Sequence, residues 1–291
     1  MSDEVKMIGF YHRGDLDGVS SGAILKKAFG ERIVLYGIEY GDKIDFDKLI
    51  QKGDTVYMID FCVEPFTKML ELNKKAKLIW IDHHITSINE MKHSGVEFLG
   101  ILGDEKNSKS AAQLAWENFF PNKSLPKGIE LISLFDTWQH EFKSEILDFY
   151  RGLETDTGLS INSKSWEYIF ENRIEFIQST TNMGSVINKY ITANNKQYAL
   201  EHGLETIFEG YKAITINKGF GGAMMFDSIW DEDKYDLMIA YSRRGNGTWR
   251  ISLYTTKKNV DCSAIASKWG GGGHKAAAGF ATDGINLPFE I

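Results

Sequence analysis

The stretch KLIWIDHH at residues 77–84 joins a short apolar run to an aspartate and two adjacent histidines. A run of this length that is rich in Ile, Leu and Trp is typical of a strand buried within a sheet. Asp82, His83 and His84 then stand where that strand ends. Because two adjacent imidazoles at a sheet edge have few uses in packing, this stretch predicts both a buried strand and a polar site at its end.

Four more apolar runs in the first 140 residues predict strands, and helical patterns separate several of them. The five predicted strands are residues 5–11, 32–40, 55–61, 77–82 and 96–102. The predicted helices are residues 20–29, residues 64–73 with Pro65 in the first turn, and residues 108–120. Strands that alternate with helices indicate an α/β fold, with a mostly parallel sheet and helices on both of its faces.

The rest of the chain changes character twice. Residues 165–207 have apolar positions spaced for one or two helices, with a break expected near 182–184. Strand patterns return at 213–216, 237–241 and 249–254, and a helical pattern follows at 262–269. We therefore predict an N-terminal domain at residues 1–164, a helical linker at 165–209 and a smaller C-terminal α/β domain at 210–291.

Composition and charge narrow the classes of partner. The 291 residues include 33 Lys and Arg against 40 Asp and Glu, a net charge of −7. Proteins that hold long nucleic acids usually present a basic face, so we expect no binding of long duplex nucleic acid, while short nucleotides remain compatible with a local pocket. Two cysteines, no signal-peptide pattern and no apolar run near the roughly 20 residues that span a bilayer predict a cytoplasmic protein without membrane contact.

Polar residues follow the ends of three predicted strands. They are His12, Asp15 and Asp17 after the first strand, Asp60 after the third, and Asp82, His83 and His84 after the fourth. The carboxyl ends of parallel strands lie along one edge of a sheet, where open α/β folds bind their ligands. Asp136 lies in a later helical run, LISLFDTW, where a carboxylate is costly to bury unless it is paired or binds a metal ion.

These carboxylates have no lysine among them, so they would repel one another strongly if they converged. Two divalent cations would remove that repulsion. Oxygen ligands mixed with histidine suit Mn²⁺, or alternatively Mg²⁺, better than a sulfur-rich zinc site would. The pattern therefore predicts a pair of divalent cations.

Simpler interpretations exist for each motif taken alone. A DxDG segment often only caps a helix, and a similar pattern begins the haloacid-dehalogenase phosphatases, although those enzymes need the first Asp directly at the strand end. Asp60 alone is equally compatible with a metal ligand and a helix cap. The glycine run GGGGH at 270–274 is compatible with a flexible turn. It lacks the P-loop spacing, but residues 276–280 resemble a helix start, which favours an anion cradle of glycine N–H groups.

Taken together, the DLDG segment at 15–18, Asp60, the DHH triplet at 82–84, Asp136 and the distant glycine run resemble the DHH phosphoesterase superfamily. The glycine-rich end resembles the C-terminal DHH-associated domain, and the nano-RNase branch is the most similar. The motifs occur in the family's order at both ends of the chain, which makes the combination far more specific than any one motif. The superfamily also includes RecJ-type exonucleases, cyclic-dinucleotide phosphodiesterases and type II pyrophosphatases.

The resemblance implies roles for individual residues. One Mn²⁺ would be held by His12, Asp15 and Asp60, and the other by Asp17, Asp60, His83 and Asp136, with Asp60 as the bridge. His84, with Asp82, would serve catalysis at the substrate phosphate. In the tail, Gly271, Gly272, Gly273 and His274 would bind the substrate, together with Arg243 in place of a strand arginine that many relatives carry; Arg244 and Arg250 are alternatives to Arg243.

The resemblance also implies a function. We expect a Mn²⁺-dependent phosphodiesterase that hydrolyses short oligonucleotides to mononucleotides, with removal of a phosphate from a bisphosphorylated nucleotide as a second activity. The alternatives are a type II-like inorganic pyrophosphatase and a catalytically inactive nucleotide-binding regulator. Dimers occur among the relatives, so a homodimer is compatible with the resemblance.

Overall fold

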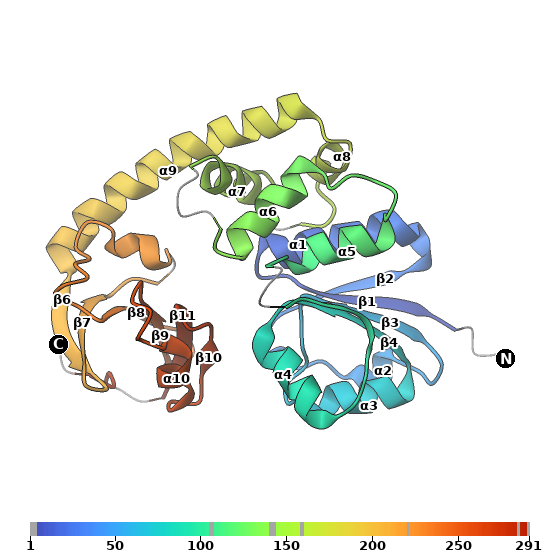
Figure 1. The fold of residues 1–291 in the computed structure, drawn as a ribbon, viewed down its shortest axis with the longest axis horizontal. Helices are drawn as coiled ribbons and strands as arrows, with labels where there is room; N and C mark the ends of the chain where they lie inside the picture. Colours follow the sequence, from blue (N-terminus) through green and yellow to red (C-terminus); the bar gives the residue numbers. More distant parts are fainter. Residues whose placement is uncertain are drawn as a thin grey trace. The chain divides into compact units, whose positions relative to one another are not determined.

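The computed structural model of the chain describes residues 5–104, 108–139, 144–157, 160–219, 221–283 and 286–289. The chain divides into two compact units, Met1–Asn188 and Lys189–Ile291, and Figure 1 shows the elements of each. Two units of α/β structure confirm the predicted fold class. The three-part division with its boundaries after residues 164 and 209 stays a prediction.

The first unit contains a parallel sheet with the strand order β2-β1-β3-β4-β5. Its strands are β1 (Met7–His12), β2 (Val34–Ile38), β3 (Thr55–Ile59), β4 (Lys77–Asp82) and β5 (Leu99–Leu102). Its helices are α1 (Leu16–Phe29), the short 3₁₀ turn η1 (Gly30–Arg32), α2 (Phe46–Leu49), α3 (Thr67–Lys75), α4 (Ile85–Ser94), α5 (Ala111–Phe119), α6 (Lys127–Asp136), α7 (Ser144–Thr157) and α8 (Ser165–Phe170). All five predicted strands are present, each within a few residues of its predicted bounds.

Helices cover both faces of this sheet, which is why its strands are apolar on both sides. On one face α1 and α5 pack against the sheet, with Trp116 and Phe149 among the buried side chains of that core. On the other face α2, α3 and α4 enclose a second core that includes Met69 and Trp80 (Figure 1). Burying one large apolar side chain of this kind stabilises the fold by roughly 1.5–3 kcal/mol. The two cores hold the carboxyl edge of the sheet in place between them.

The helix predicted at residues 64–73 begins later than expected. It starts at Thr67, and Pro65 precedes it rather than occupying its first turn. The Glu64–Pro65 peptide bond is cis. The periodicity located the helix but not its first residue, because the chain turns before the helical hydrogen bonds begin.

The helix break predicted near residues 182–184 is wrong. Helix α9 (Ile174–His202) runs without interruption through this segment and continues into the second unit. Gly184 has a packing reason instead, since a Cβ there would lie 1.7 Å from the carbonyl oxygen of Asp148 on α7. Gly152 makes the reciprocal approach, 2.1 Å from the carbonyl oxygen of Thr180. The two glycines therefore let α7 and α9 cross closely.

The second unit contains a mixed sheet with the order β10-β11-β9-β8-β7-β6. Its strands are β6 (Leu204–Phe208), β7 (Tyr211–Ile216), β8 (Leu237–Arg243), β9 (Trp249–Tyr254), β10 (Gly272–Gly273) and β11 (Ala277–Thr282), accompanied by the 3₁₀ turn η2 (Ala223–Phe226) and by α10 (Cys262–Ser267). β6 lies within residues 165–209, where a helical linker was expected. In the structure, α9 ends at His202, and β6 then pairs with β7 along its whole length.

The glycine run does not precede a helix, so the helix start predicted at residues 276–280 is wrong. Gly270 has φ +73° and ends the turn after α10. β10 then pairs antiparallel with β11, and Ala277 accepts a hydrogen bond of 2.7 Å from the backbone N–H of His274. The alanine-rich segment is a strand because it pairs with β9 from end to end and buries Phe280 in the core.

In the described part of the chain, no helix combines the length and the apolar character that crossing a bilayer demands. Both cysteines, Cys62 and Cys262, are buried free thiols in different units.

Candidate metal centre

Three neighbouring strands of the first unit deliver polar side chains to one edge of the sheet. His12 is the last residue of β1, Asp60 follows the end of β3, and Asp82 is the last residue of β4. Because β1, β3 and β4 are adjacent and parallel, their carboxyl ends coincide. The convergence that the strand pattern predicted is therefore present.

Helix α1 places the two aspartates of the DLDG segment in different environments. Asp15 is the N-cap of α1, where its side chain accepts a hydrogen bond of 2.9 Å from the N–H of Gly18. Asp17 lies in the first turn, fully buried, and its two oxygens accept hydrogen bonds from the N–H groups of Ala111 and Ala112. Those N–H groups begin α5, so the positive end of that helix faces the Asp17 carboxylate.

One group of possible ligands gathers around His12. Its Nδ1 atom lies 3.1 Å from Oδ2 of Asp15 and 3.6 Å from Oδ2 of Asp60. These ligand atoms lie within 4.8 Å of one another, close enough to hold one metal ion. His12, which the resemblance implied as a ligand, thus lies in the cluster.

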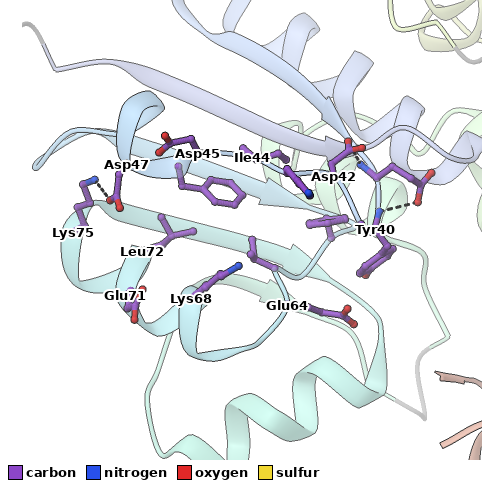
Figure 2. Close-up of a pocket in the computed structure, with 16 residues that line it drawn as sticks. Tyr40, Asp42, Ile44, Asp45, Asp47, Glu64, Lys68, Glu71, Leu72 and Lys75 are labelled. Carbon is purple, nitrogen blue, oxygen red and sulfur yellow. Dashed lines mark hydrogen bonds and ion pairs between the residues drawn. The ribbon is translucent and has the colours of Figure 1, made fainter. Parts of the chain in front are cut away.

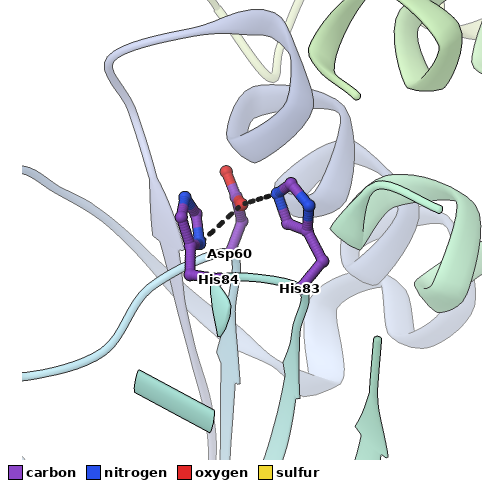
Figure 3. A group of neighbouring side chains, drawn as sticks. All are labelled: Asp60, His83 and His84. Atoms are coloured by element: carbon purple, nitrogen blue, oxygen red, sulfur yellow. Dashed lines mark ion pairs between the residues drawn. The ribbon is translucent and has the colours of Figure 1, made fainter. Parts of the chain in front are cut away.

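A second group gathers around His83. Its Nε2 atom lies 3.1 Å from Oδ2 of Asp136, 3.5 Å from Oδ1 of Asp60 and 3.8 Å from Oδ2 of Asp17. Figure 3 shows His83 and His84 on either side of Asp60, from which ion pairs extend to both rings. Asp136, the last residue of α6, reaches this group from outside the sheet. All six residues predicted as metal ligands therefore meet in the two groups.

Asp60 lies between the two groups, with Oδ2 toward His12 and Oδ1 toward His83. Its backbone has φ +55°, a left-handed conformation that is uncommon for a side-chain-bearing residue and that recurs at functional sites. The buried Oδ1 of Asp60 and Oδ2 of Asp136 accept no well-aligned hydrogen bond in the described structure, and both lie against Nε2 of His83, at 3.5 and 3.1 Å. Buried carboxylates that share a single imidazole are costly, and a cation would compensate both. The donor set of carboxylates and imidazoles fits a divalent ion.

The pKa shifts of the buried carboxylates also favour a site for cations. Burial, followed by the nearby charges of Asp60 and Asp136, raises the pKa of Asp17 well above its usual range. Burial likewise raises the pKa of Asp136 to about 7, although the charge of His83 opposes the shift. Burial alone would raise the pKa of Asp60, but the close contacts with the His12 and His83 rings outweigh it and lower that pKa. Protons thus compensate the charge of the cluster, and cations could take their place.

The histidines show the complementary shift. Burial lowers the pKa of His12, yet its hydrogen bonds to Asp15 and Asp60 outweigh this and raise the pKa to about 11. For His83 the same balance, with Asp60 as the main partner, raises the pKa to about 10. A metal ion bound by these rings must displace their protons.

Asp82 does not join the metal groups but holds His84. Its Oδ1 accepts hydrogen bonds from the backbone N–H groups of His83 and His84 and lies 2.7 Å from Nδ1 of the His84 ring. Its Oδ2 accepts from the indole N–H of Trp80 at 3.2 Å. Because Asp82 is fully buried, its carboxylate reaches a substrate only through His84. This arrangement favours a positioning role for Asp82 over the direct catalytic role predicted from sequence.

Glu39 is a residue that the sequence analysis missed. Its Oε1 lies 3.0 Å from Nε2 of His12 and accepts a second hydrogen bond from the N–H of Tyr40. A Cβ on Gly14 would lie 2.5 Å from Oε2 of Glu39, so the glycine makes room for this contact. Glu39 directly follows β2, the strand next to β1. The sequence analysis considered polar residues at the ends of three predicted strands. Considering the end of the second predicted strand, 32–40, in the same way would have identified Glu39.

Two curated proteins and a solved structure are similar to this chain. No protein-family model matches the chain. It is 27% identical to the uncharacterized protein R106 of Acanthamoeba polyphaga mimivirus, over 99% of this chain and 70% of that protein. It is 25% identical to the oligoribonuclease NrnB of Bacillus subtilis, over 94% of this chain and 72% of that protein. The similarity to an oligoribonuclease fits the DHH phosphoesterase superfamily that the sequence motifs resemble.

A solved structure shows the same fold. The exopolyphosphatase-related protein from Bacteroides fragilis is 17% identical, with a TM-score of 0.50 over 97% of this chain and 88% of that chain. At this level of identity the likeness concerns the fold alone.

The residues predicted to bind substrate in the C-terminal part of the chain lie at two places in the second unit. Gly272 and Gly273 form β10, Gly271 precedes it and His274 follows it. Arg243 pairs with Trp249, which in turn pairs with Thr282 at the far end of β11, whereas Gly273 pairs with Ala278. Four residues of strand correspond to roughly 13 Å. Arg243 therefore does not lie beside the glycine segment.

Arg243 has a packing partner of its own. Its guanidinium lies over the ring of Trp249, 5.6 Å from the centroid. Arg250, on the adjacent strand β9, pairs with Ala281 and shares a sheet face with Ser252 and Gly279. By position, Arg250 suits the substitute role better than Arg243.

Proposed function

We propose that this chain is a divalent-metal-dependent phosphodiesterase that hydrolyses short oligonucleotides to mononucleotides, with Mn²⁺ as the preferred ion. The observation that carries the proposal is the position of Asp60, whose Oδ2 faces the group around His12 and whose Oδ1 faces the group around His83, where buried carboxylates share one imidazole. The similarity to an oligoribonuclease over 94% of this chain supports the choice of substrate class.

Each residue of the cluster has a defined task in this proposal. His12, Asp15 and Asp60 would hold one ion, and Asp17, Asp60, His83 and Asp136 would hold the other. Such ions, when bound, would supply charge neutralisation of the phosphoryl oxygens and a water molecule of lowered pKa. The hydrogen bonds of Asp17 to the start of α5 keep its carboxylate in a fixed orientation.

His84 is the residue that we assign to the substrate phosphate. Asp82 fixes the ring through Nδ1 at 2.7 Å, and in our proposal Nε2 contacts the phosphate. Burial lowers the pKa of His84, but the charge of Asp82 and its hydrogen bond outweigh burial and raise that pKa to about 9. A ring that carries a proton at neutral pH stabilises negative charge on the phosphate or donates a proton to the leaving group.

The C-terminal unit has a supporting role in this proposal. The segment from Gly271 to His274 binds the end of the substrate distant from the scissile bond. The acidic net charge of −7 agrees with a short substrate rather than long duplex nucleic acid.

The experiment is release of mononucleotides from a dinucleotide in the presence of Mn²⁺, compared between the wild-type protein and Asp60→Ala. We expect turnover by the wild-type protein and a loss of at least 1,000-fold in the variant, because Asp60 lies in both groups. Glu167→Ala, an exposed position on α8, is the matched control.

Two results would overturn the proposal. Equal turnover by the wild-type protein and Asp60→Ala would remove the metal mechanism. Absence of turnover by a folded, Mn²⁺-loaded wild-type protein would favour a nucleotide-binding regulator instead.

A further inference from the structure

A cavity of about 670 Å³ opens on the first unit, on the side of the sheet covered by α2 and α3 (Figure 2). One wall is the segment 39–47 that follows β2, and the other is formed by residues 61–64 and by α3. This volume lies within the range of sites that bind small molecules. No role in metal binding or in the chemistry assigned above requires a cavity in this place.

One end of the cavity adjoins the metal centre. Glu39 lines it and bonds to Nε2 of His12. The ring of Tyr40 lies 5.8 Å from the ring of His12 and 4.5 Å from that of Phe61, the residue that follows Asp60. A molecule with its phosphate at the metal centre could therefore extend past Tyr40 into the cavity. The Asp47–Lys75 ion pair marks the opposite end (Figure 2).

The charges along the walls argue against a second phosphate as the occupant. Most of the lining ions are already paired: Asp42 with Arg13, Asp45 with Lys48, and Asp47 with Lys75. Four remain whose side chains have no hydrogen-bond or ion-pair partner in the described structure, namely Glu64, Glu71, Lys43 and Lys68. Two acids and two amines give no net positive charge, whereas phosphate sites gather cations.

The chemistry of the walls suits a neutral molecule with an aromatic face and several hydroxyl groups. Tyr40 packs on Phe61 at 4.5 Å between ring centroids and is still 41% exposed, so part of its surface is accessible to a ligand. The Lys68 side chain extends toward the middle of the cavity (Figure 2), where its amine can donate hydrogen bonds. The Glu64 carboxylate can accept hydrogen bonds from hydroxyl groups. Aromatic side chains stack on nucleobases whatever the base, since every base has a π-face.

We propose that this cavity binds the terminal nucleoside of the substrate, with its base stacked on Tyr40 and its polar groups within reach of Lys68 and Glu64. The inference rests on the proposed function for the identity of the substrate, and it assigns a part of the substrate to residues outside the metal centre. It also implies that the end of the substrate in the cavity carries no further phosphate. Short oligomers with an unphosphorylated end therefore fit best.

The test measures binding of adenosine, which contains no phosphate, to the intact protein by calorimetry. We expect saturable binding that weakens roughly 5- to 150-fold in Tyr40→Leu, the range of a lost base-stacking contact. Tyr40→Phe, which keeps the ring, should bind as the wild-type protein does. Tyr190→Leu, a 70% exposed tyrosine outside the cavity, is the matched control.

Lys68→Ala is a second test variant. Lys68 lies on the opposite wall of the cavity, away from the metal centre. We expect adenosine to bind roughly 2- to 12-fold more weakly, as for one lost hydrogen bond. Adenosine binding that is absent in the wild-type protein, or equally strong in wild-type, Tyr40→Leu and Lys68→Ala proteins, would overturn the inference. Adenosine binding that depends on Tyr40, in a protein without dinucleotide turnover, would refute the proposed function and leave the nucleoside site standing.

Discussion

The Nε2 atom of His12 lies 3.0 Å from Oε1 of Glu39, on the side of the ring opposite to the metal centre. Nδ1, the other ring nitrogen, faces Asp15 and Asp60. A carboxylate that accepts the outer N–H of a ligating histidine fixes its tautomer and its orientation. Glu39 therefore determines which nitrogen of His12 is presented to a metal ion.

Glu39→Ala should weaken binding of Mn²⁺ by roughly 10- to 100-fold, the usual cost of losing such a partner. Glu39→Gln, whose amide oxygen can still accept the hydrogen bond, should lose less. The measurement is titration of the metal-free protein with Mn²⁺, with Glu31→Ala at an exposed position as the control. Unchanged affinity in Glu39→Ala would show that the contact does not orient His12.

A backbone contact fixes the start of α1 against the end of β1. A Cβ on Gly18 would lie 2.1 Å from the carbonyl oxygen of His12, so Gly18→Ala forces His12 and the Asp15–Asp17 turn apart. We expect a loss of about 1–3 kcal/mol in the free energy of unfolding, together with weaker Mn²⁺ binding. Chemical denaturation and metal titration measure the two effects.

Gly245→Ala is the control for this variant, since a Cβ there has nothing within 4 Å. If Gly18→Ala were as stable as the control and bound Mn²⁺ as the wild-type protein does, α1 would not depend on this close approach.

The centre could be predicted from sequence because its residues follow a rule of topology. Parallel strands end at one edge, so the polar residues at the ends of 55–61 and 77–82 were expected to meet those after 5–11. The DLDG segment follows His12 closely in the sequence, so Asp15 and Asp17 were also expected to lie near His12. Glu39 escaped because one acidic residue at a strand end carries no motif of its own.

The glycines misled the sequence analysis for a physical reason. Glycine marks a break in an isolated helix, but Gly184 permits a close approach to Asp148, which lies on another helix 36 residues earlier in the chain (184 − 148). Likewise, the alanine-rich segment 276–280 favours a helix by intrinsic propensity, yet pairing with β9 makes it a strand. The local sequence pattern predicts neither of these long-range contacts.

The metal-free protein should lose stability as the pH rises above neutrality. His12, His83 and His84 have pKa values raised to about 11, 10 and 9, against about 6.5 in an unfolded chain. Between these limits the folded protein binds more protons than the unfolded one, so raising the pH favours unfolding. The stabilisation is complete below about pH 6.5 and disappears as the pH passes through the folded values.

Thermal unfolding in EDTA between pH 6 and pH 10 measures the slope of stability against pH. With Mn²⁺ the slope should be smaller or reversed, because the metal replaces the protons and binds more tightly at higher pH. His93→Gln, at an exposed position on α4, should leave the slope unchanged. A metal-free protein that is equally stable across this range would contradict the proton-holding cluster.

In the second unit, we expect the side chain of His274 to affect turnover of the substrate but not folding. The turn that it begins is closed by its backbone, through N–H to the carbonyl oxygen of Ala277 at 2.7 Å, so His274→Ala should fold normally. If the side chain binds a substrate phosphate, its loss should lower kcat/KM for a dinucleotide roughly 10- to 150-fold, as for a hydrogen bond to a charged group. A small generic phosphodiester, which does not extend to a second site, should lose much less. His202→Ala, a 48% exposed histidine at the end of α9, is the control, and equal losses on the two substrates would refute a role for His274 in anchoring the substrate.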